Sequence, residues 1–552
     1  MGSGGPRAGD APGGHVRDGH TSDPLVGRAA RSTVASLFLG QARVHPQRIA
    51  VRDGDRAIRY GELADRSARL AAALSARGVR RGDRVALLSE NRPEMLEVFL
   101  AAARLGAVVA CQSWRLATPE LAHCLRIVEP AAFLVSPRHA AALAGAGGGQ
   151  PIVFGDDYDQ LLARAAPGPE QGAALDQVDP EDPLLILYTS GTTGLPKGAV
   201  LSHRAEVMRN LVVRAEFGVA PHDTFVAWSP LYHMGAAECA LGALMSGGAV
   251  ITVDGFDAAR LADIVASEEL GWLLLMPGMV GRFARELSVR GVAPRGVKVC
   301  GVMADLVPPH EIAEITRLLG APYANTFGAT ETGCPPCSSS LLPVGVAPTS
   351  LSKRQSPFCE IRLVDPESDD DREVPDGSPG ELCMRGPTLF SGYWREPEVN
   401  RRDFRGGWFH MGDVFVRNPD GTLDFVDRVK YLIKSGGENV YPAEIERAIM
   451  QDPRVEEVAV VRWPDPTWGE VPIAFVARAD ASLDEADLAR LCRAQLAGYK
   501  QPRRILFIAR AEFPRSASGK VQRHELEARL EAEAAAADAT TQTGQDPQEK
   551  TP

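Results

Sequence analysis

The sequence lacks any long hydrophobic run and any excess of positive charge. None of its apolar stretches reaches the length of about eighteen residues that a transmembrane helix needs. The formal net charge is −11, which argues against nonspecific binding to nucleic acid. These two absences predict a cytoplasmic protein that has no membrane span and no nucleic acid partner.

A regular cysteine pattern is also missing. The chain has nine cysteines, and the only C-x-x-C, Cys334 to Cys337, has no second pair and no histidine nearby. Zinc sites and disulfide frameworks need such spacings, so we expect reduced thiols and no metal at this motif.

The length of 552 residues exceeds what one hydrophobic core holds, so we expect several domains. Residues 1–30 are rich in Gly, Asp, Arg and His and read as a disordered leader without the apolar segment of a secretory signal. Residues 531–552 begin with an Ala/Glu run and end in polar residues, which predicts a fraying helix and a disordered tail.

Short apolar runs alternate with helical patterns through the first half of the chain. A parallel-rich sheet layered with helices follows from this alternation. The predicted strands are residues 48–52, 57–60, 84–88, 107–110, 132–135 and 184–187, and the predicted helices are residues 60–77 and 93–105. A second, smaller α/β pattern begins after residue 427.

Residues 188–198 read Tyr-Thr-Ser-Gly-Thr-Thr-Gly-Leu-Pro-Lys-Gly directly after a buried strand. Glycines allow backbone N–H groups to approach phosphate oxygens, while hydroxyls and a lysine add further donors. The stretch is not a P-loop, because Gly198 and not Ser or Thr follows the lysine. The candidate phosphate-binding residues are Thr189, Ser190, Gly191, Thr192, Thr193, Gly194 and Lys197.

Four more motifs follow in order. They are Asn-Thr-Phe-Gly-Ala-Thr-Glu-Thr at 325–332, Gly-Trp-Phe-His-Met-Gly-Asp at 407–413, Lys-Ser-Gly-Gly-Glu-Asn-Val-Tyr-Pro at 434–442 and Pro-Arg-Ser-Ala-Ser-Gly-Lys at 514–520. Together with the phosphate loop they resemble the adenylate-forming superfamily of acyl- and aryl-CoA synthetases, peptide-synthetase adenylation domains and beetle luciferases. The resemblance covers residues 33–530.

The resemblance implies a large N-terminal domain over residues 31–426 and a small mobile α+β domain over residues 427–530, with Asp427 as the hinge. It implies ATP and Mg²⁺ at the first three motifs, where an aromatic ring stacks on adenine and a carboxylate holds the metal. The nucleotide residues it adds are Asn325, Thr326, Phe327, Gly328, Thr330, Asp413 and Arg428. Glu331 is the implied metal ligand.

Catalytic roles and the thiol site are also implied by the resemblance. The implied catalytic residues are Lys520, Glu331, His233 and Thr189, and the implied CoA-binding residues are Lys434, Gly436 and Gly437. The implied acyl pocket contains His233, Met234, Ala237, Met276, Gly301 and Met303, together with Phe327. Apart from His233 these side chains are small or apolar, which favours an apolar monocarboxylate such as a fatty or aryl acid.

Two segments depart from the superfamily pattern. Residues 301–304 read Gly-Val-Met-Ala where relatives often have Gly-Gly-Ala-Pro, and residues 352–355 read Ser-Lys-Arg-Gln where a Gly-Arg-Pro turn is usual. Met411 also replaces a usual threonine. The sequence explains none of these changes.

The sequence therefore predicts an ATP-dependent acyl-CoA synthetase that works through an acyl-adenylate, with a carboxylic acid, ATP and CoA as its partners. The main alternative is a stand-alone ligase that loads a carrier protein. A luciferase-type oxygenase is more remote and would show as light emission. A nucleotide-binding relative that has lost its chemistry is expected to lack Lys520, Glu331 or Asp413, and all three are present. The pattern leaves open whether the protein is a monomer or a homodimer.

Overall fold

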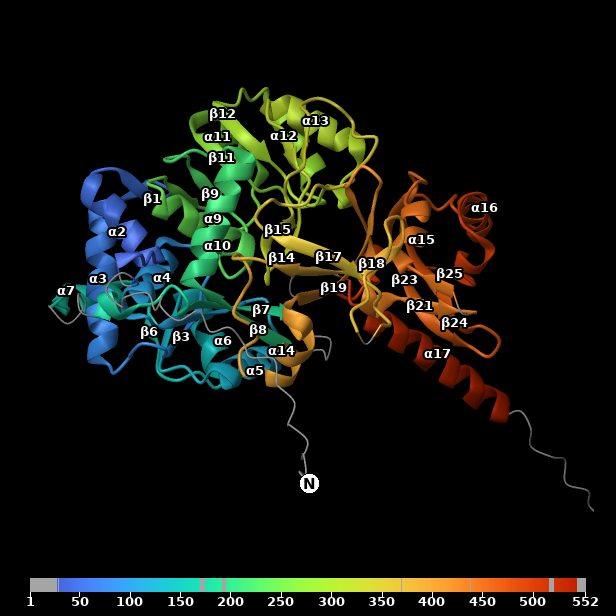
Figure 1. The fold of residues 1–552 in the computed structure, drawn as a ribbon, viewed down its shortest axis with the longest axis horizontal. Coiled ribbons are helices and arrows are strands. Elements are labelled where there is room, and N and C mark those ends of the chain that lie inside the picture. Colours follow the sequence, from blue (N-terminus) through green and yellow to red (C-terminus); the bar gives the residue numbers. More distant parts are fainter. Residues whose placement is uncertain are drawn as a thin grey trace, which may run out of the picture.

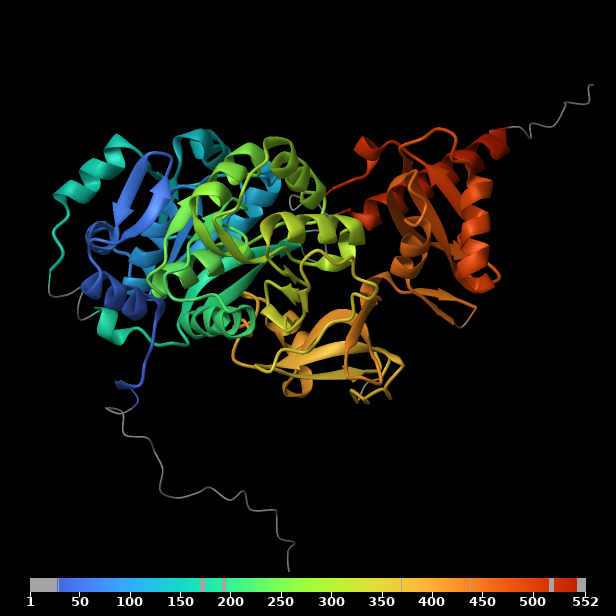
Figure 2. The ribbon, with the colours of Figure 1, turned by 90° about the horizontal axis from the view of Figure 1, so that it is seen from above.

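The structure is a computed structural model that describes residue 27 and residues 29–168, 174–190, 195–368, 370–436, 438–515 and 521–543. The predicted leader lies almost wholly outside these ranges. The α/β fold class is confirmed: sheets layered with helices form a large N-terminal part, and a smaller α/β unit follows to one side of it (Figures 1 and 2).

The largest sheet has the strand order β6-β5-β3-β4-β7-β8. Its strands are β3 (Arg84–Leu88), β4 (Val108–Gln112), β5 (Ala132–Val135), β6 (Ile152–Val153), β7 (Pro183–Ser190) and β8 (Pro196–Ser202). All neighbouring pairs are parallel except β7 and β8. The helices of this region are α2 (Val34–Val44), α3 (Tyr60–Ala76), α4 (Pro93–Leu105), α5 (Thr118–Val128), α6 (Ala140–Gly145) and α7 (Asp156–Arg164).

Helix α4 shows how the sequence sets these boundaries. Pro93 stands in its first turn, where its missing N–H costs nothing, and Gly106 closes it in the left-handed conformation with φ of 67°. Almost every residue between them is buried, because the helix packs between other layers of the domain.

Two further sheets follow in the N-terminal part. Their orders are β2-β1-β10-β9 and β11-β12-β13-β16. The strands are β1 (Ile49–Asp53), β2 (Arg56–Arg59), β9 (Phe225–Ala227), β10 (Val250–Thr252), β11 (Glu269–Leu273), β12 (Gly296–Cys300), β13 (Tyr323–Ala324) and β16 (Leu341–Leu342). The helices are α9 (His203–Phe217), α10 (Met234–Met245), α11 (Ala258–Ser267), α12 (Val280–Arg290) and α13 (Pro309–Leu319).

An antiparallel sheet of order β17-β18-β19-β20 leads toward the C-terminal unit, beside the hairpin β14-β15. These strands are β14 (Phe327–Ala329), β15 (Gly333–Cys337), β17 (Glu360–Val364), β18 (Pro379–Arg385), β19 (Phe409–Arg417) and β20 (Leu423–Arg428), and helix α14 spans Pro397–Asp403. The domain boundary that the sequence places at residue 427 falls inside β20, and it stays a prediction.

The C-terminal unit has a sheet of order β22-β21-β24-β23, and β25 pairs in parallel with β24 further along that strand than β21 does. Its elements are β21 (Ile433–Ser435), β22 (Glu438–Val440), α15 (Pro442–Ile449), β23 (Val455–Asp465), β24 (Gly469–Arg478), α16 (Glu485–Gln495), β25 (Arg504–Phe507) and α17 (Arg523–Thr543). Helix α17 continues past residue 530 to Thr543, in the segment where the sequence predicts a fraying helix. Among the described residues, no helix combines the length and apolarity that a membrane crossing requires.

Candidate active site

The described ends of the predicted phosphate loop lie in two neighbouring antiparallel strands, β7 and β8. Strand β7 does not end at Leu187 as the sequence predicts, but continues to Ser190, and β8 returns antiparallel with Thr189 opposite Lys197. The sequence prediction missed β8, although the run Ala-Val-Leu at 199–201 was a signal for it. The positions Gly191, Thr192, Thr193 and Gly194 lie outside the described residues, as does the side chain of Ser190.

The hairpin is clamped by the segment Gly392-Tyr-Trp394. The N–H of Val200 donates to the carbonyl of Gly392 over 3.0 Å, and the N–H of Trp394 donates to the carbonyl of Gly198 over 2.8 Å. Gly198 leaves no room for a side chain, because a Cβ there would lie 2.7 Å from a methyl carbon of Ile186. The clamp fixes the strand that carries Lys197.

Lys197 and Glu331 converge on Tyr393. The Tyr393 hydroxyl donates to Oε1 of Glu331 over 2.8 Å, and Nζ of Lys197 lies 5.6 Å from the centroid of the Tyr393 ring. Burial and the Glu331 charge raise the pKa of Tyr393, so its hydroxyl stays protonated and acts as the donor. The sequence prediction missed Tyr393 as a site residue.

The backbone of Thr330, the residue before Glu331, accepts a hydrogen bond from Arg209 of α9. Nη2 of Arg209 donates to the carbonyl of Thr330 over 3.0 Å, and its Nε donates to the carbonyl of Thr388 over 3.0 Å. The Arg209 side chain is 1% exposed, so a fully buried cation positions this segment.

The adenine-stacking candidate, Phe327, lies in a cluster of aromatic rings. Its ring stacks on Phe425 with a centroid distance of 5.3 Å and meets the edge of Phe415 at 4.8 Å. Asn325 and Thr326 are buried just before it, and Nδ2 of Asn325 donates to the carbonyl of Leu351 over 2.9 Å.

Gly328 allows the hairpin β14-β15 to close tightly. A Cβ at this position would lie 1.9 Å from the carbonyl oxygen of Gly333, which no side chain tolerates. A glycine is therefore required at position 328 by the close packing of the two strands of this hairpin.

Asp413 and Arg428 face each other across β19 and β20. Their Cα positions are in register, and Nε of Arg428 lies 3.0 Å from Oδ1 of the buried Asp413. The Asp413 charge raises the pKa of Arg428, and Glu331 adds to this effect. The structure thus brings three predicted nucleotide-site residues within electrostatic reach of one another.

The segment before Asp413 is anchored by Glu381 of β18. Nδ1 of His410 lies 3.1 Å from Oε2 of Glu381, and the N–H of Gly412 donates to Oε1 of the same carboxylate over 3.1 Å. Cys383 completes a buried group of three metal-ligating residue types whose ligand atoms lie within 4.8 Å of one another. The two contacts to Glu381 fix the backbone that leads into Asp413.

Asp427, the predicted hinge, is 2% exposed, and its carboxylate accepts hydrogen bonds from backbone N–H groups of both β20 and α15. Its Oδ2 accepts from the N–H of Ala443 in the first turn of α15 over 2.7 Å, and its Oδ1 accepts from the N–H of Arg428 over 2.7 Å. Burial raises its pKa to about 6, although Arg523 and both backbone donors act in the opposite direction.

The predicted CoA residues lie at the hairpin β21-β22. Gly436 adopts φ of 61°, and a Cβ there would lie 2.7 Å from the ring of Trp468. Lys434 is exposed and pairs with Glu367 of the preceding sheet's β17–β18 connection. Gly437 and the predicted catalytic Lys520 lie outside the described residues.

The predicted acyl-pocket residues gather at the start of α10 and the ends of two strands. His233 is the N-cap residue of α10, is half-buried, and has its ring centroid 4.7 Å from that of Tyr232. Met234 and Ala237 follow on the helix. Met276 lies beyond the end of β11 and is half-buried.

Gly301 and Met303 line the connection after β12 in left-handed conformations. Gly301 has φ of 76°, and a Cβ there would overlap the ring of Tyr323. Met303 has φ of 48°, which costs a non-glycine residue roughly 1–2 kcal/mol. Strain of this kind is concentrated at functional sites.

The second departure from the superfamily pattern contacts the residue that directly follows the first. Lys353 is fully buried, and its Nζ lies 2.5 Å from Oδ2 of Asp305, which follows the Gly-Val-Met-Ala segment. The backbone of Lys353 pairs in both directions with Leu423 of β20. The lysine therefore ties the acyl-pocket connection to the strand that carries Asp427.

Known proteins match this chain along most of its length. The family model for AMP-binding enzymes matches residues 38–394, and the model for the AMP-binding enzyme C-terminal domain matches residues 444–520. A feruloyl-CoA synthase of Amycolatopsis sp. is 36% identical over 495 residues, which is 89% of this chain and 97% of that protein.

Two further relatives also match most of the chain. The indoleacetate–CoA ligase of Aromatoleum aromaticum is 33% identical, over 88% of this chain and 96% of that protein. The solved o-succinylbenzoate CoA synthetase of Bacillus subtilis, in complex with its acyl-adenylate intermediate, has a TM-score of 0.77 at 26% identity, covering 89% of this chain and 97% of that one. The chain belongs to the AMP-binding enzyme family, within the adenylate-forming superfamily.

Proposed function

We propose that this protein is an AMP-forming acyl-CoA synthetase for an aryl acid. The observation that carries the proposal is the convergence of Lys197, Tyr393 and Glu331 beside the pair of Asp413 and Arg428. This arrangement offers positive charge for phosphates, a carboxylate for a cation and a buried carboxylate for ribose hydroxyls. The relatives named for aryl acids support the substrate class.

The first half-reaction joins the acid to AMP. A carboxylate oxygen of the substrate attacks the α-phosphorus of ATP, the bond to the bridging oxygen breaks, and pyrophosphate leaves. Lys197 would bind the departing phosphates, and Lys520 would neutralise charge that develops between carboxylate and α-phosphate. Thr189 would orient the phosphates from the hairpin, and His233 would line the junction of acid and adenylate.

Glu331 fits a Mg²⁺ ion that accompanies ATP. One of its oxygens accepts from Tyr393, and the other makes no hydrogen bond to the part of the chain that the structure describes. A half-buried carboxylate oxygen is the ligand type that Mg²⁺ prefers. When bound, Mg²⁺ supplies positive charge at the phosphate oxygens.

The second half-reaction transfers the acyl group to CoA. The thiolate attacks the acyl carbonyl carbon, a carbon–sulfur bond forms, and AMP leaves with the electron pair of the broken mixed anhydride. The turn at Gly436 and Gly437 would line the pantetheine path after the C-terminal unit rotates about Asp427. A carrier protein as thiol acceptor remains the alternative function.

A pyrophosphate-release screen tests the proposal. The protein is incubated with MgATP and a panel of aryl, fatty and short acids, with and without CoA. We expect an aryl acid to give a single turnover of pyrophosphate without CoA and continuous AMP formation with it. Formation of ADP, or pyrophosphate release that does not depend on any acid, contradicts the proposal.

A further inference from the structure

The connection after β12, residues 301–306, begins between two hydrogen bonds from buried aromatic side chains. Nε1 of Trp272 donates to the carbonyl of Gly301 over 3.0 Å. The hydroxyl of Tyr323 donates to the carbonyl of Val302 over 2.9 Å. Both aromatic side chains are buried, so the start of the connection is fixed against the core.

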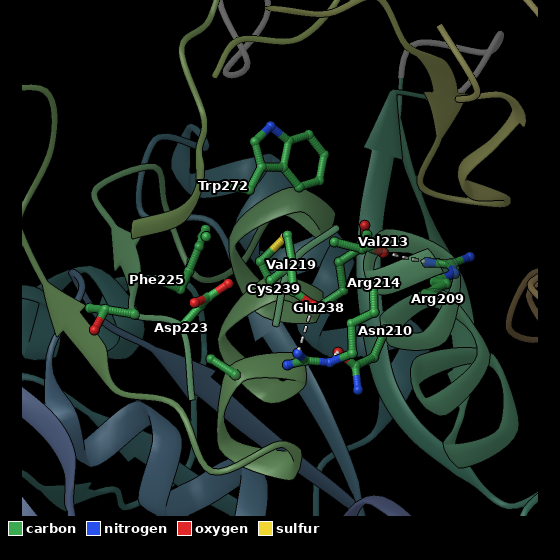
Figure 3. A pocket seen from close by; sticks show the side chains of 13 residues that line it. Arg209, Asn210, Val213, Arg214, Val219, Asp223, Phe225, Glu238, Cys239 and Trp272 are labelled. Atoms are coloured by element: carbon green, nitrogen blue, oxygen red, sulfur yellow. Dashed lines mark hydrogen bonds and ion pairs between the residues drawn. The ribbon is translucent and has the colours of Figure 1, made fainter. Parts of the chain in front are cut away.

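Trp272 is itself held in place. The ring of Phe217 meets it edge-on, with the ring centroids 4.8 Å apart. Trp272 also lines the cavity drawn in Figure 3, but the space there that water can reach is about 30 Å³, which admits about one water molecule. This cavity is too small for an aryl acid, so the role of Trp272 toward the predicted acyl pocket is to hold Gly301.

The end of the connection is fixed by an ion pair with a distant segment. Nζ of Lys353 lies 2.5 Å from Oδ2 of Asp305, in the 3₁₀ turn Ala304–Leu306. The Lys353 side chain is 0% exposed, whereas the Asp305 side chain is 31% exposed. Lys353 is anchored in turn, because its N–H and its carbonyl both pair with Leu423 of β20.

Met303 lies between these fixed points in a strained conformation. Its φ of 48° and ψ of 60° are left-handed, a region that is unfavourable for a residue with a Cβ. Its side chain is half-buried and packs against the main hydrophobic core of the N-terminal part. A residue keeps such a conformation only where its surroundings over-determine it.

The buried charge of Lys353 supplies that constraint. Besides Asp305, its Nζ donates to the carbonyl of Leu351 over 3.2 Å. The same carbonyl accepts from Nδ2 of Asn325, a predicted nucleotide residue, over 2.9 Å. If the connection moved away, an ammonium group in the interior would lose its counter-charge, which is strongly unfavourable. This cost opposes relaxation of Met303.

We infer that Lys353 is a positioning residue for acid selection: through Asp305 it holds Met303 in place in the predicted acyl pocket and thereby sets the size of the acid that is accepted. The inference rests on the proposed function and identifies a residue that governs substrate choice without touching the acid. It also gives a role to the departure at residues 352–355, which the sequence alone does not explain.

Pairs of aryl acids that differ by one ring methyl group test this inference. We expect the wild-type protein to use one acid of a pair at least about tenfold better in kcat/KM, because one methylene in a shaped apolar pocket has an effect of this order. Lys353→Met removes the ammonium group at similar length. Its preference ratio should fall to within about threefold of one, mainly through KM, since the contact is far from the reacting bond.

A double-mutant cycle tests whether Lys353 acts through Met303. Met303→Gly removes both the side chain and the strain, because glycine adopts a positive φ readily. Lys353→Met should lower the preference ratio in the wild-type background and leave it unchanged in the Met303→Gly background. The same reduction in both backgrounds contradicts the inference.

Two further variants guard against a general effect on folding. Asp305→Ala breaks the ion pair from its exposed side and should lower the ratio as Lys353→Met does. Lys298→Met is the matched control, since Lys298 lies on β12 itself and pairs with Asp223 at 2.7 Å, but is 41% exposed. Its ratio should equal that of the wild type. The ratio compares two acids on one enzyme sample, so partial loss of folded protein does not change it.

The outcomes separate this inference from the proposed function. Aryl-CoA formation without a tenfold preference in any pair, or with a preference that Lys353→Met and Asp305→Ala leave intact, overturns the inference and leaves the synthetase function standing. Absence of pyrophosphate release with every acid overturns the function, and the inference with it. A preference that is lost in Lys353→Met and kept in Lys298→Met supports the inference.

Discussion

The hydroxyl of Tyr393 donates a hydrogen bond to Oε1 of Glu331 over 2.8 Å. The two residues belong to motifs that lie far apart in the chain, and the same tyrosine ring faces the ammonium of Lys197 at 5.6 Å. One side chain thus connects the phosphate hairpin with the proposed metal ligand. The relative position of the Lys197 ammonium and the Glu331 carboxylate depends on this contact.

Tyr393→Phe removes the hydroxyl and keeps the ring that faces Lys197. A hydrogen bond to a charged group contributes about 1.5–3 kcal/mol, so we expect acyl-adenylate formation to slow by about tenfold or more and the apparent Mg²⁺ requirement to rise. The measurement is pyrophosphate release at saturating acid across a Mg²⁺ titration. Tyr431→Phe, at a tyrosine outside this contact, serves as the control. A wild-type rate and Mg²⁺ dependence for Tyr393→Phe would show that the hydroxyl does not hold Glu331 for its role.

Glu206 makes the stability of the protein depend on pH. Burial raises the pKa of Glu206 from 4.5 to about 8. Between these values the native state keeps the proton that the unfolded chain has lost, so stability falls as pH rises through this window. The contribution is fully present below about pH 4.5 and lost above about pH 8.

Glu206→Gln mimics the protonated form at every pH. We expect it to match the wild type in unfolding free energy near pH 5 and to exceed it by a few kcal/mol near pH 9, on the order set by the pKa shift. Urea unfolding at both pH values measures this. The exposed Glu62→Gln is the control and should track the wild type. A constant difference between Glu206→Gln and the wild type across the range would contradict the assignment.

Asp427 is predicted to be the pivot between the two half-reactions. Asp427→Pro fixes φ near about −65° and prevents the change in backbone angle that a pivot requires. We expect one half-reaction to lose much more rate than the other. Asp427→Ala is the control, since it loses the bonds to the N–H groups of Ala443 and Arg428 but keeps backbone freedom. Equal loss in both half-reactions of the proline variant would place the pivot elsewhere.

Much of the fold follows from local sequence signals. Helix α4 has its proline and glycine at the expected ends, and β3 to β5 are continuous apolar runs, because strands buried on both faces need no polar alternation. Strand β8 was missed because its first residues, Pro196 to Gly198, have a turn-like composition. Only its pairing with β7 and the segment at 392–394 makes it a strand.

The sequence motifs predict several residues of the candidate site, but they do not predict the tertiary contacts between those residues and their neighbours. Motifs identify Lys197, Glu331 and Asp413, since the chemistry demands these residue types. Tyr393 acts through a tertiary contact that no spacing encodes. Arg209 is one of several charged residues on α9, whereas Glu238 lies on the otherwise apolar α10, and only the packing of α9 against α10 brings the two together.

Lys520 is predicted to serve the first half-reaction only. Negative charge concentrates at the α-phosphate during adenylation, and loss of one positioned donor typically costs about 10²–10³ in rate. Lys520→Ala should therefore form little acyl-AMP from acid and MgATP. Given preformed acyl-AMP and CoA, it should form thioester at close to the wild-type rate in a single turnover. If the variant is equally impaired there, the lysine stays at the site through both steps and the two-conformation scheme is wrong.

The central claim is that an aryl acid passes through an adenylate to CoA. The most direct test supplies the protein with MgATP, an aryl acid, CoA and a phosphopantetheinylated carrier protein together, and identifies every product by mass. The account predicts aryl-CoA, AMP and pyrophosphate in equal amounts and an unmodified carrier. Acylated carrier without aryl-CoA, or no thioester of any kind while ATP is consumed, would contradict it.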